Sequence, residues 1–257
     1  MGAFLIALDM ICIWRYSKEE VIIMNILCIG NSFSQDATRY LHQIARADGV
    51  KLNAYNLYIG GCSLERHYRN MLSGGAAYQL DINGTSTPFF VSLKQALLAQ
   101  SWDYISVQQA SVQSDDFDNY EPFLTAPCDY VRKCAPKAKL IMHQTWAYSN
   151  DSPRLKYESH DAMFTKIRTA YEQAAGTIKA DLIIRSGETM SALVAAGLEP
   201  VYRDGYHASY GVGRYALGLT WYKALTGADV SLNSFSDLDD DVSADMISTI
   251  KSIVMQL

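Results

Sequence analysis

Short apolar runs alternate with longer helical stretches along most of this chain, and this alternation constrains its fold more than any other feature. The short runs are rich in Ile, Leu, Val and Tyr, which is typical of strands that are buried on both faces of a parallel sheet. The expected strands are residues 25–30, 52–59, 104–109, 139–144 and 181–185. Strands that alternate with helices predict a parallel sheet with helices covering both faces.

The helical stretches fall between and after these strands. We expect helices near residues 36–48, 92–100, 120–134, 155–176, 189–197, 208–226 and 242–256. The chain has 257 residues and contains no internal repeat or Pro/Gly-rich linker. The pattern therefore predicts an α/β fold of the three-layer α/β/α flavodoxin-like type, with about five parallel strands. A single domain is expected over residues 24–257.

One segment interrupts the alternation. Residues 78–82 and 85–91 both resemble strands, and Asn83-Gly84 lies between them. An Asn-Gly pair in this position favours a tight hairpin turn, because both residues tolerate positive φ. We expect a small β-hairpin excursion near 78–91, either shaping a substrate pocket or decorating an edge of the domain.

The first residues form a separate question. Residues 3–14 are apolar except for Asp9, but a bilayer span needs about 20 apolar residues. Arg15 and Lys18 follow the apolar run, whereas a secretory signal carries its positive charge before it. Two interpretations stay open for residues 1–23: an extension upstream of a true start at Met24, or an additional helix packed on the domain.

Composition excludes several classes of partner. Lys and Arg total 22 against 27 for Asp and Glu, a net charge of −5, so nothing indicates a surface for nucleic acid or an anionic membrane. Hydrophobic residues make up 49% and charged residues 19%, which is typical of a globular protein. The five cysteines match no zinc-binding spacing. Cys28 lies in an apolar run typical of a buried thiol, and we expect a reducing, cytoplasmic location.

Ligands of doubly wound sheets bind beyond the carboxyl ends of the strands, so the residues at those ends are candidates for a site. The first strand ends in Gly30-Asn31-Ser32-Phe33-Ser34, followed by a helix. A serine at a helix N-terminus can act as a nucleophile whose own N–H helps to bind an oxyanion. Two alternatives stay open at this point: Ser32 or Ser34 only caps the helix, or the turn binds a phosphate.

The next two strand ends offer hydrogen-bond donors. Gly60-Gly61 follows the second strand and could bring backbone N–H groups close to a ligand, or could simply form a tight turn. Gln108-Gln109 ends the third strand. Side chains alternate along a strand, so one glutamine is expected to face the site, where its amide could donate to an oxyanion. Two polar residues where a strand leaves the sheet are the ordinary alternative.

A late segment supplies the remaining groups for nucleophilic catalysis. The chain has five histidines, and His207 alone has an aspartate, Asp204, three residues before it in a Gly-containing segment at a helix start. A nucleophilic serine needs a base, and the base needs a group that orients it. Asp204 and His207 are close enough in sequence to form such a pair.

The combination of Gly-Asn-Ser-Phe-Ser, a glycine after the second strand and a late Asp-x-x-His resembles the SGNH (GDSL-like) hydrolase superfamily. The resemblance extends from residue 25 to about residue 227. It implies that Ser32 is the nucleophile, His207 the base and Asp204 the residue that orients it. It also implies an oxyanion hole formed by the N–H groups of Ser32 and Gly61 and by a side chain from the third strand.

The chain departs from the superfamily pattern in two places. Its first block is GNSFS rather than GDS, and its third block lacks Gly-x-Asn-Asp. The third block is more similar to that of sialate-O-acetylesterase-like members, in which a glutamine takes the place of the asparagine. We expect Gln109 to be the third oxyanion donor, with Gln108 as the second choice and otherwise a substrate-binding residue.

Aromatic residues near the strand ends suggest the substrate. His143 is expected to line the pocket, and Trp146, Tyr148 and Tyr206 to form platforms for a sugar; packing in the protein interior is the alternative for the aromatic side chains. The resemblance implies hydrolysis of a small-molecule or carbohydrate ester, with an acetyl ester of a carbohydrate favoured and no metal or cofactor required. The alternatives are a non-catalytic carbohydrate-binding protein, a lipase or thioesterase of the same superfamily, or nucleotide or flavin binding at the Ser32 turn.

Overall fold

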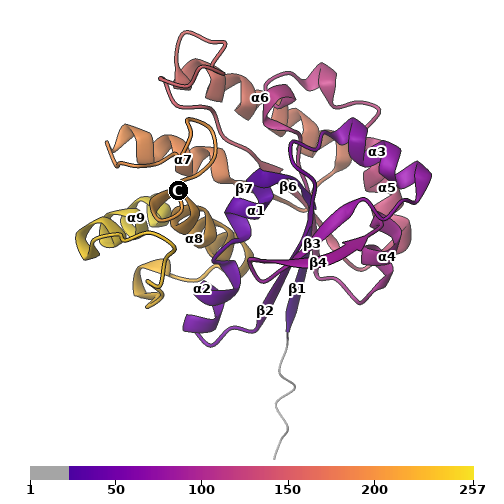
Figure 1. The fold of residues 1–257 in the computed structure, drawn as a ribbon, viewed down its shortest axis with the longest axis horizontal. Coiled ribbons are helices and arrows are strands. Elements are labelled where there is room, and N and C mark those ends of the chain that lie inside the picture. Colours follow the sequence, from indigo (N-terminus) through magenta and orange to yellow (C-terminus); the bar gives the residue numbers. More distant parts are fainter. Residues whose placement is uncertain (1–22) are drawn as a thin grey trace, which may run out of the picture.

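The computed structural model describes residues 23–257, built around a seven-stranded sheet with the order β4-β3-β2-β1-β5-β6-β7 (Figure 1). The strands are β1 (Met24–Gly30), β2 (Leu52–Tyr58), β3 (Tyr78–Ile82), β4 (Thr85–Val91), β5 (Tyr104–Val107), β6 (Lys139–Gln144) and β7 (Leu182–Arg185). The five strands β2-β1-β5-β6-β7 are parallel. Their order is that of flavodoxin-like folds, which confirms the predicted fold class.

Strand β1 lies at the centre of the sheet. Its carboxyl end is therefore held in place from both sides. Ile26, Leu27 and Cys28 are fully buried, because helices cover both faces of a parallel sheet. β1 pairs with β2 on one side and with β5 on the other. The turn that follows Gly30 therefore emerges in the middle of the molecule.

Helices form a layer on each face of the sheet, as Figure 1 shows. One layer contains α1 (Ser32–Thr38), α2 (Leu41–Ala47), α7 (Ser186–Ala195), α8 (Val212–Thr226) and α9 (Ala244–Gln256). The other contains α3 (Leu64–Ser73), α4 (Leu93–Leu98), α5 (Thr125–Cys134) and α6 (His160–Ile178). All the expected helices are present in some form, with shifted ends.

Two helical features differ from the sequence prediction. The expected helix at 36–48 is two helices, because the chain leaves helical geometry at Tyr40, whose ring is buried and whose hydroxyl donates to the carbonyl of Tyr210. Helix α3 was not predicted, because few apolar residues mark its buried side. Ser63 caps it by accepting a hydrogen bond from the N–H of Arg66.

The predicted hairpin is confirmed as β3 and β4, and it extends the sheet rather than leaving it. β3 pairs antiparallel with both β2 and β4. Asn83 and Gly84 have φ values of 52° and 81°, as a hairpin turn of the I′ type requires. Gly84 also packs so closely on α1–α2 that a Cβ there would lie 2.0 Å from the carbonyl oxygen of Arg39.

The interpretations offered for residues 1–23 fall, apart from Ile23, outside the described residues. Within residues 23–257, no helix combines the length and the apolar character that crossing a membrane requires.

Candidate active site

Three polar side chains from the two ends of the chain meet at the carboxyl edge of the sheet. Ser32 is the first residue of α1, directly after β1 and its cap residue Asn31. Its hydroxyl oxygen lies 2.8 Å from Nε2 of His207, although 175 positions separate the two residues. Nδ1 of the same imidazole lies 2.7 Å from a carboxylate oxygen of Asp204. The structure thus brings together Ser32, His207 and Asp204, the three residues predicted from the sequence. We refer to them below as the triad.

The environment of Asp204 sets the roles of the two imidazole nitrogens. Partial burial raises the pKa of Asp204, but the hydrogen bonds from the side chain and backbone of His207 outweigh it and hold the pKa below its ordinary value. Asp204 is therefore ionised at neutral pH and accepts a hydrogen bond from the Nδ1–H of His207. With a proton on Nδ1, Nε2 of His207 is the nitrogen that can accept the proton of Ser32. The tautomer is assigned from these partners.

The loop that carries His207 is closed by its own backbone. The N–H of Arg203 donates to the carbonyl of His207 at 3.1 Å, and the N–H of His207 donates to the Asp204 carboxylate at 2.8 Å. Gly205 has a φ of 82°, a conformation that favours glycine. Its carbonyl accepts a hydrogen bond from the N–H of Ser149 at 2.8 Å. These bonds hold the imidazole in one place relative to its carboxylate.

A buried carboxylate joins this loop to α1, the helix that begins at Ser32. Asp36 lies one turn after Ser32 in α1 and is fully buried. Nη1 of Arg203 lies 2.9 and 3.0 Å from its two oxygens, and Nε of Arg214 donates to it at 2.8 Å. Arg203 also donates to the carbonyl of Ala208. The residue immediately before Asp204 is thereby anchored to α1.

Ser32 and His207 line a hollow of about 270 Å³, the triad hollow. Its lining comprises the nucleophile turn, the loop after β2, the segment after β5 and the late histidine loop: Asn31, Ser32, Phe33, Gln35, Tyr58, Gly60, Gly61, Ala110, Ser111, Val112, Arg154, Arg203, Tyr206 and His207. The first N–H groups of a helix have no partner within it, so the N–H of Ser32 is available at this wall.

Gly61 lines the same hollow as Ser32. It has a φ of 59°, and the turn around it is closed by a bond from the N–H of Cys62 to the carbonyl of Ile59 at 3.1 Å. Gly61 is the third residue of this turn, and its positive φ is typical of a type II turn. The Gly60–Gly61 peptide is then not part of the closing hydrogen bond, so its N–H is free to bind a ligand. The N–H of Gly61 is the candidate second donor to an oxyanion.

Gln109 does not reach this hollow, so its predicted placement is wrong. It is fully buried, and its amide nitrogen donates to the carbonyl of Asn119 at 2.9 Å. Its side-chain oxygen accepts from the N–H groups of Leu64 and Ala110 at 3.0 and 2.8 Å. The residue organises the start of α3 and the segment after β5 rather than facing a ligand.

Gln108 also lies behind the hollow, where it supports the nucleophile turn. Its amide nitrogen donates to the side-chain oxygen of Asn31 at 2.8 Å, and its oxygen lies 2.7 Å from Nδ1 of His143. Asn31 in turn donates to the carbonyl of Cys62 at 3.1 Å. Gln108 is therefore not a substrate-binding residue in this arrangement. It belongs to a buried chain that links the nucleophile turn to the loop of Gly61.

The predicted pocket residues divide into two groups. His143 is fully buried between Gln108 and Ser186, and Trp146 is fully buried with its ring stacked 4.1 Å from that of Phe33. The prediction that His143 lines the pocket is wrong, and Trp146 follows the alternative given for the aromatic residues, because both rings are packed in the protein interior. Tyr206 does line the triad hollow, and Tyr148 lines an adjacent one.

Sequence analysis did not identify Asp36 or Arg154 and assigned no role to Arg203. Asp36 stands four positions after Ser32, and Arg203 directly precedes Asp204. Their positions next to the predicted catalytic residues were therefore a usable signal. Arg154 is exposed in the loop of residues 149–159 that precedes α6, and a single arginine just before the predicted helix at 155–176 gave no signal. Among residues 23–257, no group of three or more His, Cys, Asp or Glu side chains is placed to hold a metal ion.

Comparison with known proteins places the chain in a family. Residues 25–253 match the family described as "Domain of unknown function (DUF4886)". The chain belongs to the DUF4886 family. The crystal structure of a DUF4886 family protein from Bacteroides uniformis is 34% identical, covers 91% of this chain and 94% of that chain, and has a TM-score of 0.85. The comparison with curated proteins gave no match.

More distant structures share the fold of this DUF4886 protein. A protein from Parabacteroides merdae described as a GDSL-like lipase is 13% identical over 79% of this chain and 97% of that chain, with a TM-score of 0.55. The acetyl xylan esterase AlAXEase is 14% identical over 79% of this chain and all of that chain (100%), with a TM-score of 0.54. At these identities the likeness establishes the fold, which is that of SGNH hydrolase structures.

The Asp36 contacts lead to a prediction about stability. Asp36→Asn leaves two arginine side chains without their buried counter-charge, and we expect the free energy of unfolding to fall by about 3–5 kcal/mol. Asp239→Asn is the matched control, because Asp239 also pairs with Arg214 but its side chain is 31% exposed. Its loss should cost about 1 kcal/mol or less. Urea denaturation of both variants measures the difference; equal losses would contradict the role given to Asp36.

The buried histidines lead to a prediction about pH. Burial lowers the pKa of both His67 and His143 to about 3. Below the unfolded-state pKa of about 6.5, the unfolded chain binds protons that the folded protein does not. The free energy of unfolding therefore decreases as the pH is lowered. Each histidine should cost about 2 kcal/mol between pH 7 and pH 5. His143→Gln should reduce this dependence by about half in denaturation measurements at both pH values; an unchanged dependence would be inconsistent with a neutral, buried His143.

Proposed function

We propose that this DUF4886 protein is a serine hydrolase that cleaves a carboxylic ester through an acyl-enzyme on Ser32. The observation that carries the proposal is the 2.8 Å approach of the Ser32 hydroxyl to Nε2 of His207, whose other nitrogen lies 2.7 Å from Asp204. This is the arrangement of nucleophile, base and orienting acid that acyl transfer requires. It opens into a hollow at the carboxyl ends of β1 and β2, where ligands of this fold class bind.

The proposed reaction has two stages. In the first, Nε2 of His207 takes the Ser32 proton as the hydroxyl oxygen attacks the ester carbonyl carbon, and the oxyanion is held by the N–H groups of Ser32 and Gly61. The imidazolium then gives its proton to the leaving alcohol as the ester C–O bond breaks. In the second stage, His207 takes a proton from a water molecule as the water oxygen attacks the carbonyl carbon of the acyl-enzyme. His207 then returns this proton to the Ser32 oxygen as the bond to Ser32 breaks and the acid leaves.

We propose an acetyl ester of a carbohydrate as the substrate. The hollow is small, which suits a short acyl group, and the half-buried ring of Tyr206 gives it one aromatic wall. Supporting this choice, an acetyl xylan esterase is among the proteins that share the fold. A panel of esters that varies the acyl chain tests the choice; faster turnover of long-chain esters or thioesters would favour the lipase or thioesterase alternative.

Ser32→Ala is the direct test of the nucleophile. It should reduce the hydrolysis of nitrophenyl and sugar acetates by roughly 10³-fold or more without unfolding the protein, since only binding and the oxyanion donors then remain. Initial rates and a thermal melt measure the two effects. If the wild-type protein shows no esterase activity and both it and Ser32→Ala bind sugars, the carbohydrate-binding alternative is supported.

Ser34→Ala is the matched control within the same turn. The Ser34 hydroxyl is buried, 2.9 Å from the carbonyl of Asn31 and 2.6 Å from the side-chain oxygen of Asn56. Its removal should lower stability by about 1–3 kcal/mol and leave ester hydrolysis largely intact at a temperature where the variant is folded. If Ser34→Ala abolishes activity and Ser32→Ala does not, the nucleophile has been assigned to the wrong serine.

A further inference from the structure

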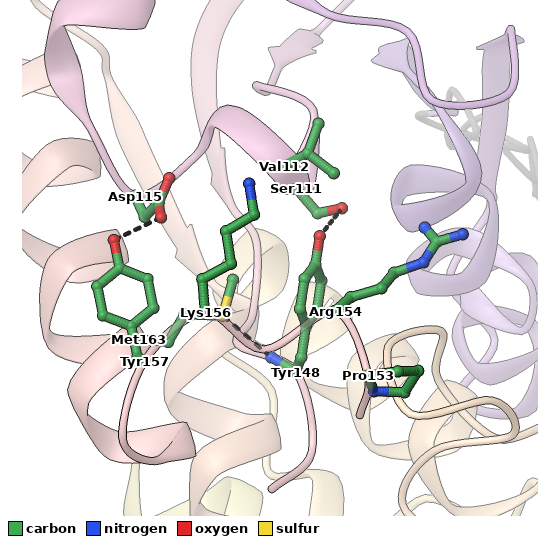
Figure 2. A pocket seen from close by; sticks show the side chains of 9 residues that line it. All are labelled: Ser111, Val112, Asp115, Tyr148, Pro153, Arg154, Lys156, Tyr157 and Met163. Carbon is green, nitrogen blue, oxygen red and sulfur yellow. Dashed lines mark hydrogen bonds between the residues drawn. The ribbon is translucent and has the colours of Figure 1, made fainter. Parts of the chain in front are cut away.

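A second hollow lies directly beside that of the triad. It has a volume of about 290 Å³, and Figure 2 shows the side chains that line it. Ser111, Val112 and Arg154 belong to the walls of both hollows. A molecule with its ester at Ser32 and a further group beyond the ester would therefore pass along Arg154.

Arg154 is held close to the catalytic base by stacking. Its guanidinium carbon lies 3.9 Å from the centre of the Tyr206 ring, within the range of a cation–π contact. The Tyr206 ring lies in turn 4.1 Å from that of His207, centre to centre. In Figure 2 the guanidinium points away from Lys156 and Asp115, toward the ribbon of the early part of the chain.

The charge of Arg154 is not used within the described part of the protein. Among residues 23–257, no carboxylate lies within 4.0 Å of its guanidinium, and that group donates no hydrogen bond. The other arginine at the triad hollow, Arg203, forms an ion pair with the buried Asp36. Arg154 therefore presents an uncompensated positive charge at the shared wall of the two hollows.

The rest of the second hollow adds to this charge. Lys156 lines it and has no ion pair within residues 23–257. The one carboxylate in the lining, Asp115, accepts a hydrogen bond from the Tyr157 hydroxyl at 2.6 Å. The two hollows together thus carry a local excess of positive charge in a protein whose net charge is −5.

We propose that Arg154 is a specificity-determining residue that binds a carboxylate on the alcohol portion of the ester. The substrate class is then an acylated acidic sugar, of the uronic acid type, rather than a neutral one. The planar guanidinium fork matches a carboxylate with two parallel hydrogen bonds. The stacked Tyr206 ring restricts the fork before the substrate arrives, which lowers the entropy lost on binding. This inference rests on the proposed ester hydrolysis.

The test uses two esters that differ only in the charged group. Methyl glucuronoside and methyl glucoside, acetylated at the same ring hydroxyls, are compared as substrates of the full-length protein. We expect kcat/KM to favour the uronoside by roughly 10-fold, mainly through KM, since a charge-assisted pair at an open site is worth about one order of magnitude. Added salt should reduce the preference. The corresponding ester of a sugar phosphate should not be preferred over the uronoside; if it is, the carboxylate assignment is wrong.

Arg154→Gln and Arg168→Gln form the matched pair of variants. Arg168 also lies over an aromatic ring, that of Phe164, at 6.0 Å, but it lines neither hollow. Arg154→Gln should bring the preference for the uronoside close to one, whereas Arg168→Gln should leave it unchanged. Equal turnover of both esters by the wild type, or a preference that survives in Arg154→Gln, would overturn the proposal.

Binding to Ser32→Ala protein separates this proposal from the proposed function. Calorimetry with the two acetylated sugars measures selectivity without turnover, and the double variant Ser32→Ala/Arg154→Gln gives the contribution of the arginine. If the wild-type protein hydrolyses neither ester, arginine-dependent selectivity in these binding measurements would support anion recognition and remove the hydrolase proposal. Hydrolysis of both esters at equal rates, without selective binding, would remove anion recognition and leave the hydrolase proposal standing.

Discussion

The arrangement at the carboxyl edge of the sheet depends on one buried carboxylate. Asp36 accepts hydrogen bonds from Arg203 and Arg214 and is itself fully buried. A carboxylate in such a place is stable only when its charge is matched and its oxygens are hydrogen-bonded. Because its two partners come from the histidine loop and from α8, meeting this requirement fixes both elements against the helix that begins at Ser32. The hydroxyl and the imidazole then meet without any direct tie in sequence.

Behind the hollow, a second set of polar contacts performs the same task for the nucleophile turn. Asn31 caps α1 and also bonds to the carbonyl of Cys62, next to Gly61, while Gln108 holds the side chain of Asn31 from below. His143 completes the chain, and burial lowers its pKa to about 3, so it stays neutral. The N–H groups of Ser32 and Gly61 are thereby kept at a constant separation, as the oxyanion hole proposed above would require.

Aromatic packing decides which face of the site is available to a ligand. Trp146 stacks on Phe33, and its indole N–H donates to the carbonyl of Tyr206 at 2.8 Å. The tryptophan thus supports the histidine loop from inside and cannot also serve as an external platform. Tyr206 takes the outer position, between His207 and the guanidinium of Arg154. The proposed specificity for acidic esters is a consequence of this stacking order.

The α/β class, the parallel strands and the turn at Asn83-Gly84 could be predicted from the chain alone, because periodicity and turn chemistry are local properties. The sequence also singled out Ser32, Asp204 and His207, whose residue types and spacing are unusual together. The directions in which Gln108, Gln109 and Trp146 point became known only from the folded structure. At a strand end the pleat no longer dictates side-chain direction, so the outcome depends on which buried donors and acceptors lie nearby. The ion pairs of Asp36, and the lack of a carboxylate beside Arg154 within residues 23–257, were likewise decided by segments far apart in sequence. Pairing of charges between distant segments leaves no periodic pattern in either segment.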